Sequence, residues 1–135
     1  MSVLSIDTEK YSQLFDIANV CEGVINCSKF GSCIHFANQF VVSVSEYDRD
    51  LLSLIRIIEG YVRARIGEDY SDHPHTYILL NNGKIIDPTF KQFSEHDRRS
   101  YLIEGKIAES YTGEEYLKLA LQDDDYSKER WKFIT

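Results

Sequence analysis

Apolar residues recur every three or four positions in the first part of the chain, as on one face of a helix. The three stripes are Tyr11, Leu14, Phe15 and Ala18, then Ile34, Ala37, Phe40, Val41 and Val44, and then Leu51, Leu54, Ile55 and Ile58. They predict helices over about 8–21, from Ser32 onward and over 47–58. Helix-start residues stand at Asp7-Thr8, Ser32 is a suitable N-cap, and Gly60 follows the third stripe.

The second part of the chain alternates polar and apolar residues over short runs, which is typical of strands. Strands are expected at 61–66, 75–80 and 84–87 and within 102–110, with an acidic loop over 67–74. Asn81-Asn82-Gly83 separates two of these runs and predicts a hairpin. Helices packed on a small antiparallel sheet make an α+β fold, here a single domain over residues 1–135.

Three shorter patterns complete the expected elements. Thr112-Gly113-Glu114-Glu115 is a capping box that opens a helix. The run Ser94–Asp97 is typical of the start of a short helix. Near the C-terminus, Trp131–Ile134 is expected to pack back as a strand.

The chain is acidic, with 15 Lys and Arg against 22 Asp and Glu and a net charge of −7. This charge opposes non-specific binding to nucleic acid. No apolar run approaches the roughly 20 residues of a membrane-spanning helix, and the N-terminus lacks the pattern of a signal peptide. The three cysteines, Cys21, Cys27 and Cys33, form no zinc-type pair. We expect reduced thiols and no membrane association, in a protein that is cytoplasmic or delivered into a host or target cell.

Three residues in separate local settings carry the chemistry that a cysteine nucleophile needs. Cys33 falls in the first turn of a predicted helix, where unpaired amides and the helix dipole stabilise a thiolate. His75 begins one strand of the hairpin and Asp87 ends the other. A base beside the thiol and a carboxylate that orients the base would complete a catalytic triad.

The length of the hairpin loop decides whether His75 and Asp87 share a face of the sheet. A two-residue turn at Asn82-Gly83 puts them on opposite faces. The wider loop Asn81–Gly83 places Asp87 opposite Tyr77, with His75 as a diagonal neighbour within reach of long side chains. The last residue of this loop is a glycine, which suits the left-handed position that the loop requires. We predict this loop, or a longer one of the same parity.

Each of these residues also has a plainer interpretation. Cys33 can be a buried structural cysteine, and Asp87 can belong to an ordinary Asp-Pro turn. His73 is the main rival of His75, but Pro74 makes an earlier strand start less favourable, so His75 is preferred. His35 points roughly 200° away from Cys33 around the helix. We interpret His35, Cys21 and Cys27 as structural.

Further candidates concern metal and oxyanion binding. Imidazole and carboxylate groups that can ligate metals gather in one stretch, at Asp69, Asp72, His73 and His75. No second ligand pair stands at a defined spacing, so no metal or cofactor is predicted. The backbone amide of Cys33 is the first oxyanion donor to consider. The side-chain candidates for oxyanion or substrate binding are Asn26, Gln13, Ser32 and Tyr77.

The segments Gly31–Ala37, His75-Thr76-Tyr77 and Asp87-Pro88-Thr89 together resemble the transglutaminase-like, papain-related cysteine enzymes. In that superfamily the cysteine opens a helix in a Gly-x-Cys-x-x-x-Ala-like setting. The histidine precedes a small residue and an aromatic, and the aspartate often falls in an Asp-Pro-Thr sequence. The resemblance covers about residues 30–93. Tyr77 stands where many members carry tryptophan, and the spacing from histidine to aspartate is short.

The resemblance implies a transglutaminase-like core and attack by Cys33 on an amide or thioester carbonyl of a protein or peptide. His75 would act as base and then as acid, oriented by Asp87. Members include peptidases, protein glutamine deamidases, transglutaminases and acyltransferases, and a deamidase, as in bacterial effectors, or a peptidase is favoured here. The alternative is a non-enzymatic protein-binding domain on the same fold, because the nine tyrosines suit an interface. The oligomeric state is left open.

Overall fold

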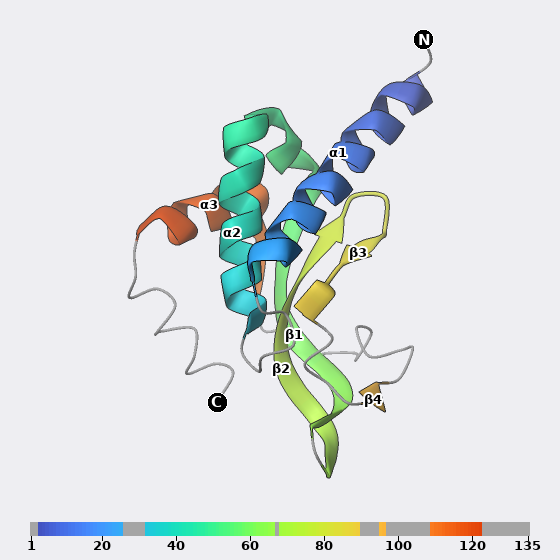
Figure 1. Cartoon of the computed structure of the whole chain (residues 1–135), viewed down its shortest axis with the longest axis vertical. Helices are drawn as coiled ribbons and strands as arrows, with labels where there is room; N and C mark the ends of the chain where they lie inside the picture. The colour runs from blue at the N-terminus through green and yellow to red at the C-terminus, as the bar shows by residue number, and fades with distance from the viewer. Residues whose placement is uncertain (1–2, 26–31, 67, 90–94, 97–108, 123–135) are drawn as a thin grey trace.

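Helices and an antiparallel sheet make up the part of the chain that the computed structural model describes, which is residues 3–25, 32–66, 68–89, 95–96 and 109–122 (Figure 1). The helices are α1 (Val3–Val24), α2 (Ser32–Tyr47) and α3 (Gly113–Gln122), with a 3₁₀ helix η1 (Arg49–Leu54). The strands are β1 (Ile55–Ile66), β2 (Asp69–Leu80), β3 (Ile85–Ile86), β4 (Glu95–His96) and β5 (Glu109–Thr112). The predicted α+β class is confirmed.

Strand β1 organises the sheet. It pairs with β2 along its whole length, from Ile55 opposite Leu80 to Ile66 opposite Asp69. On its other edge β5 pairs with the first part of β1 and β4 with the last part. Strand β3 pairs with β2, and every pairing is antiparallel. Figure 1 shows the β1–β2 hairpin extending past the helices at the end where the two strands join.

The hydrophobic core lies where the helices meet the first half of the sheet. Helix α2 packs against α1, α3, η1 and β2, so it is the central helix of the fold (Figure 1). Burial of apolar side chains is the main force that holds such layers together. The largest buried side chains of the core include Leu14, Phe40, Leu51, Leu52, Ile55, Ile57, Ile78, Leu80, Tyr116 and Leu117.

Helix α1 is longer than predicted at both ends. The sequence predicted a helix over about 8–21 that starts at Asp7-Thr8, but these residues lie inside a helix that runs from Val3 to Val24. No proline or glycine stands between Met1 and Glu22, so nothing in the sequence stops the helix before its observed start.

The predicted helix over 47–58 is wrong. The chain leaves α2 at Tyr47, makes the short η1 and enters β1 at Ile55. Apolar residues at helical spacing also fit a tight turn followed by a strand, and the isoleucines at 55, 57 and 58 are β-branched residues that favour a strand. Gly60 does not end an element but lies within β1, opposite His75.

The predicted loop over 67–74 is also wrong, because β2 begins at Asp69 and pairs with the far half of β1. Within the expected helix start at Ser94–Asp97, the structure describes Glu95 and His96. These two residues pair with β1 as a strand, so the helix prediction is wrong for them. Of the strand expected within 102–110, only residues 109 and 110 are described, and they belong to β5 (Glu109–Thr112). Residues 97–108 lie outside the described residues, as does the strand expected at Trp131–Ile134.

Two local predictions are confirmed atom by atom. In the capping box, the Glu115 backbone N–H donates to Thr112 Oγ1 at 3.1 Å, and the Thr112 N–H donates to Glu115 Oε1 at 2.9 Å. In the hairpin, the Leu80 N–H donates to the Lys84 carbonyl at 2.8 Å, which closes the loop Asn81–Gly83. Gly83 has a φ of 88°, the left-handed conformation that the loop requires.

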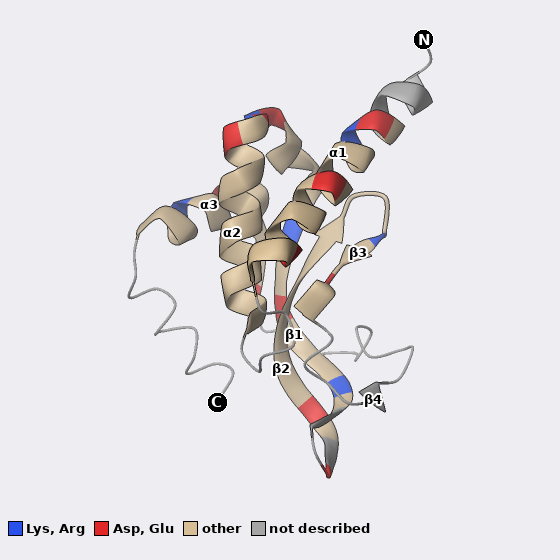
Figure 2. Ribbon diagram, viewed as in Figure 1, with Lys and Arg blue, Asp and Glu red and all other residues tan. Residues whose placement is uncertain are grey.

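Acidic and basic residues occur on both the helices and the hairpin, as Figure 2 shows. Two ion pairs between described residues join separate elements. Arg49 and Glu114 meet at 2.9 Å near the start of α3, and Arg63 and Asp72 meet at 3.0 Å across β1 and β2. Among the described helices, none has both the length and the apolar character needed to cross a membrane.

Candidate active site

Helix α2 begins at Ser32, so Cys33 lies in its first turn, as predicted. The amides of this turn have no acceptor within the helix, and they give the helix start a partial positive charge. Cys33 forms no disulfide and exposes 2% of its surface. The thiol is therefore held inside the protein, beside the end of a helix that stabilises negative charge.

The hairpin of β2 and β3 carries the other two groups. Ile78 pairs with Ile86 and Leu79 with Ile85, so one further step along the ladder places Tyr77 opposite Asp87. His75 lies two residues earlier on the same face of β2. In this register, His75 Nε2 and Asp87 Oδ2 lie 2.6 Å apart, a short hydrogen bond between side chains that are 0% and 3% exposed.

Cys33 lies close enough to His75 to interact with its imidazole by hydrogen bonding and by charge, and both effects raise the pKa of the ring. Because Nε2 faces Asp87, Nδ1 is the ring nitrogen left for Cys33. The structure thus brings together all three residues predicted as a triad, one from the start of α2 and two from the hairpin. The imidazole forms the link between the thiol and the carboxylate.

Opposing effects act on the protonation of His75. Burial alone would lower the pKa of this imidazole, but the charge of Asp87, its hydrogen bond and the contact with Cys33 outweigh burial and raise the pKa to about 10. The imidazole of His75 is therefore held in its protonated form near neutral pH, beside the carboxylate of Asp87.

Tyr77 covers one side of the histidine. Its ring stacks against that of His75 with 6.3 Å between centroids and 21° between planes. Burial and then the nearby charge of Asp87 raise the pKa of the Tyr77 phenol. Tyr77, predicted as a candidate for substrate or oxyanion binding, therefore packs against the site and remains a neutral side chain.

The structure describes two of the three other residues predicted as oxyanion or substrate-binding candidates. Ser32 is buried directly before Cys33. Gln13 is half-buried on α1, and Asn26 lies outside the described residues, as does Cys27.

The rival residues lie elsewhere or bind other groups. His73 is buried, and its Nε2 lies 3.1 Å from the Ala64 carbonyl oxygen. Strand β2 already begins at Asp69, so His73 lies within the strand, contrary to the prediction that Pro74 disfavours an earlier start. Cys21 lies 3.7 Å from Ser43 Oγ, and burial raises the pKa of its thiol. Among the described residues, no group of three or more His, Cys, Asp and Glu side chains is arranged to hold a metal ion.

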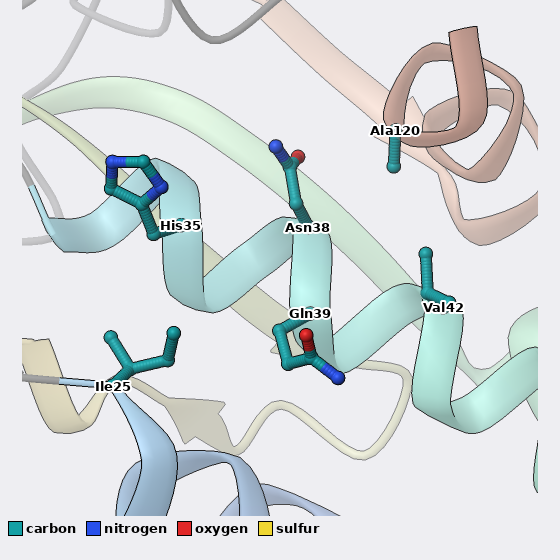
Figure 3. A pocket seen from close by; sticks show the side chains of 6 residues that line it. All are labelled: Ile25, His35, Asn38, Gln39, Val42 and Ala120. Carbon is teal, nitrogen blue, oxygen red and sulfur yellow. The ribbon is translucent and has the colours of Figure 1, made fainter. Parts of the chain in front are cut away.

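His35 is exposed, whereas Cys33 is buried, in agreement with opposite directions around the helix. It lines a pocket of about 290 Å³ that α2 shares with Ile25, just after α1, and Ala120 of α3. Figure 3 shows His35, Asn38, Gln39 and Val42 on α2, with Ile25 and Ala120 on the facing segments. His35 is therefore not a rival base for Cys33.

One contact of the site was missed from the sequence. Thr89 Oγ1 donates to Asp87 Oδ1 at 2.7 Å, and Thr89 is 1% exposed. The signal was present in Asp87-Pro88-Thr89, because a hydroxyl two residues after an aspartate often bonds locally around a turn.

Comparison of the chain with protein-family models, with curated proteins and with solved structures found no match in any of the three.

Proposed function

We propose that this protein is a small transglutaminase-like cysteine enzyme that attacks an amide or thioester carbonyl of a protein or peptide. The observation that carries the proposal is the buried imidazole of His75, which hydrogen-bonds Asp87 through Nε2 and interacts with Cys33. Cysteine-based acyl transfer requires these three groups in this order.

The first half of the proposed reaction uses the proton on His75. The Cys33 thiolate attacks the carbonyl carbon, and the imidazolium donates the proton at Nδ1 to the departing nitrogen or sulfur as the old bond breaks. The product is a thioester on Cys33 and a neutral His75. Asp87 holds the opposite N–H throughout, which keeps the ring orientation and stabilises its charged form.

The second half reverses these roles. His75 accepts a proton at Nδ1 from water or an amine as that nucleophile attacks the thioester, and the Cys33 thiolate leaves. The backbone amide of Cys33, unpaired within the first turn of α2, is the proposed donor to the oxyanion. With water as acceptor the enzyme is a glutamine deamidase or a peptidase, the two versions that we favour.

The order of elements supports the proposed family. A helix opens with the cysteine, and two antiparallel strands follow that bear the histidine and then the aspartate. The three motifs that resemble the superfamily thus belong to one site, although they stand far apart in the sequence. Three unrelated short motifs would have no reason to lie at one site, so their proximity supports the proposed family.

The first test is alkylation of each cysteine by iodoacetamide, followed by mass spectrometry from about pH 5 to about pH 9. Cys33 should react faster than a simple thiol near neutral pH, and His75→Ala should remove the excess rate. Cys21 is an internal standard, since its thiol is also buried but contacts the hydroxyl of Ser43. His73→Ala is the matched control, because it removes a buried histidine of the same strand.

Acyl transfer itself can be tested with p-nitrophenyl acetate. Release of p-nitrophenolate should accompany the gain of one acetyl group on Cys33, and Cys33→Ala should abolish both. Equal and slow reaction of all the cysteines in the first test, with no acetylation in the second, would favour the alternative of a protein-binding domain.

A further inference from the structure

Both oxygens of the Asp87 carboxylate are engaged by buried groups. His75 Nε2 lies 2.6 Å from Oδ2, and Thr89 Oγ1 donates to Oδ1 at 2.7 Å. The carboxylate side chain is 3% exposed, so water has little access to either oxygen. The hydroxyl of Thr89 therefore donates a hydrogen bond to a buried, charged oxygen, and the loss of such a bond is costly.

The backbone favours this contact. Asp87 directly follows β3, and Pro88 fixes the backbone φ angle between the aspartate and the threonine. A carboxylate held at one oxygen alone can still rotate about the bond to its Cβ, because this terminal torsion has broad wells. A second hydrogen bond on the other oxygen limits that rotation.

We propose that Thr89 is a positioning residue that fixes the Asp87 carboxylate in the orientation that holds His75 beside Cys33. This inference rests on the proposed function, because the orientation matters only if His75 moves a proton at Nδ1. Thr89 does not contact the thiol in this scheme and acts through Asp87 alone.

The test compares Thr89→Val with Thr89→Ser. Valine keeps the shape of the side chain and removes the hydroxyl, whereas serine keeps the hydroxyl. The alkylation rate of Cys33 near neutral pH should fall by roughly 10-fold to 100-fold in Thr89→Val, the range for loss of a hydrogen bond to a charged group. Thr89→Ser should restore most of the rate.

A second readout follows the imidazole directly. The NMR titration of His75 should shift to lower pH in Thr89→Val and stay near its wild-type position in Thr89→Ser. A purely structural hydroxyl would instead lower the melting temperature and leave this titration unchanged, which would overturn the proposal. Labelling of Cys21 shows whether a variant has simply lost its fold, because global opening exposes both thiols.

The two proposals fail in different ways. In one outcome, wild-type Cys33 is unreactive while the titration of His75 still depends on the Thr89 hydroxyl. This outcome would contradict the enzyme function and support the role of Thr89 in orienting Asp87. If wild-type Cys33 is reactive and Thr89→Val matches it in rate and in titration, the positioning role falls and the enzyme function stands.

Discussion

At the scale of single residues, the site depends on a charge that burial opposes. An isolated imidazolium inside a protein is costly, since it loses its hydration. At His75 the carboxylate of Asp87 offsets that cost, and the balance raises the pKa of the imidazole to about 10. The contact between His75 and Asp87 therefore also contributes to the stability of the fold.

This link gives stability a defined dependence on pH. The pKa of His75 is raised from about 6.5 in the unfolded chain to about 10 in the folded protein. Its stabilising contribution is thus fully present below about pH 6.5 and is lost as pH rises towards about 10. Asp87→Asn removes the charge behind this contribution. Near pH 6 the variant should be less stable than the wild type by about 3 kcal/mol or more, and the difference should shrink as pH rises.

Urea unfolding of both proteins at a series of pH values measures the effect. Asp72→Asn is the matched control. It also removes a carboxylate from an ion pair, in this case the pair that Asp72 of β2 forms with Arg63 of β1. Aspartate and arginine do not ordinarily titrate between pH values of about 6.5 and 10, so that variant should differ from the wild type by a constant amount. A constant difference for Asp87→Asn as well would mean that His75 is not charged in the folded protein.

At the scale of elements, short-range signals predicted the parts of the site that local geometry controls. The glycine of the loop Asn81–Gly83 fixed the loop length, and the loop length fixed the face on which Asp87 meets His75. The start of α2 could also be predicted, because Ser32 directly precedes an apolar stripe that begins at Ile34. The positions of Cys33, His75 and Asp87 on their elements could be predicted from such signals.

The pairing of β1 with the first half of β2 could not be predicted in the same way. The first half of β2 contains Asp72 and Pro74, which have low strand propensity. Pairing with β1 overrides that propensity. Proline is tolerated at residue 74 because β3 pairs with β2 only at Ile78 and Leu79 among the described strands, so Pro74 lies on an edge there. A single sequence does not show which distant strand will supply such a partner.

The hairpin loop can be tested through Gly83. Gly83→Ala should destabilise the protein by about 1–2 kcal/mol, the cost of a side chain in the left-handed conformation. The cost is conformational, since no atom lies within 4 Å of the position that an added Cβ would take. Urea denaturation provides the measurement, and Gly83→Asn should cost less because asparagine tolerates this conformation.

Gly23 provides a control with the opposite sign. It lies in α1, also without atoms within 4 Å of an added Cβ, and its φ is not positive. Gly23→Ala should therefore leave stability unchanged or raise it by up to about 1 kcal/mol. A stabilising effect of Gly83→Ala would contradict the assigned loop conformation and, with it, the basis for the register of Asp87.

At the scale of the whole molecule, the site exists only because α2 packs centrally. Its contacts with α1, α3, η1 and β2 bring the helix start to the hairpin, and Cys33 thereby reaches His75. The same packing buries the thiol, as it buries Cys21, with exposures of 2% and 1%. A reagent or substrate must therefore reach Cys33 through an opening of the folded protein.

The size of that opening separates an enzyme site from a structural thiol. Alkylation in increasing urea below the unfolding transition should show a weak urea dependence for Cys33, because a local opening exposes little surface. Cys21 should react only through global unfolding, with a steep dependence. A bulky maleimide should slow the labelling of Cys33 relative to iodoacetamide if the opening is narrow. If Cys33 follows Cys21 in every respect, the thiol is reached only by unfolding, and a function that needs it in the folded state is excluded.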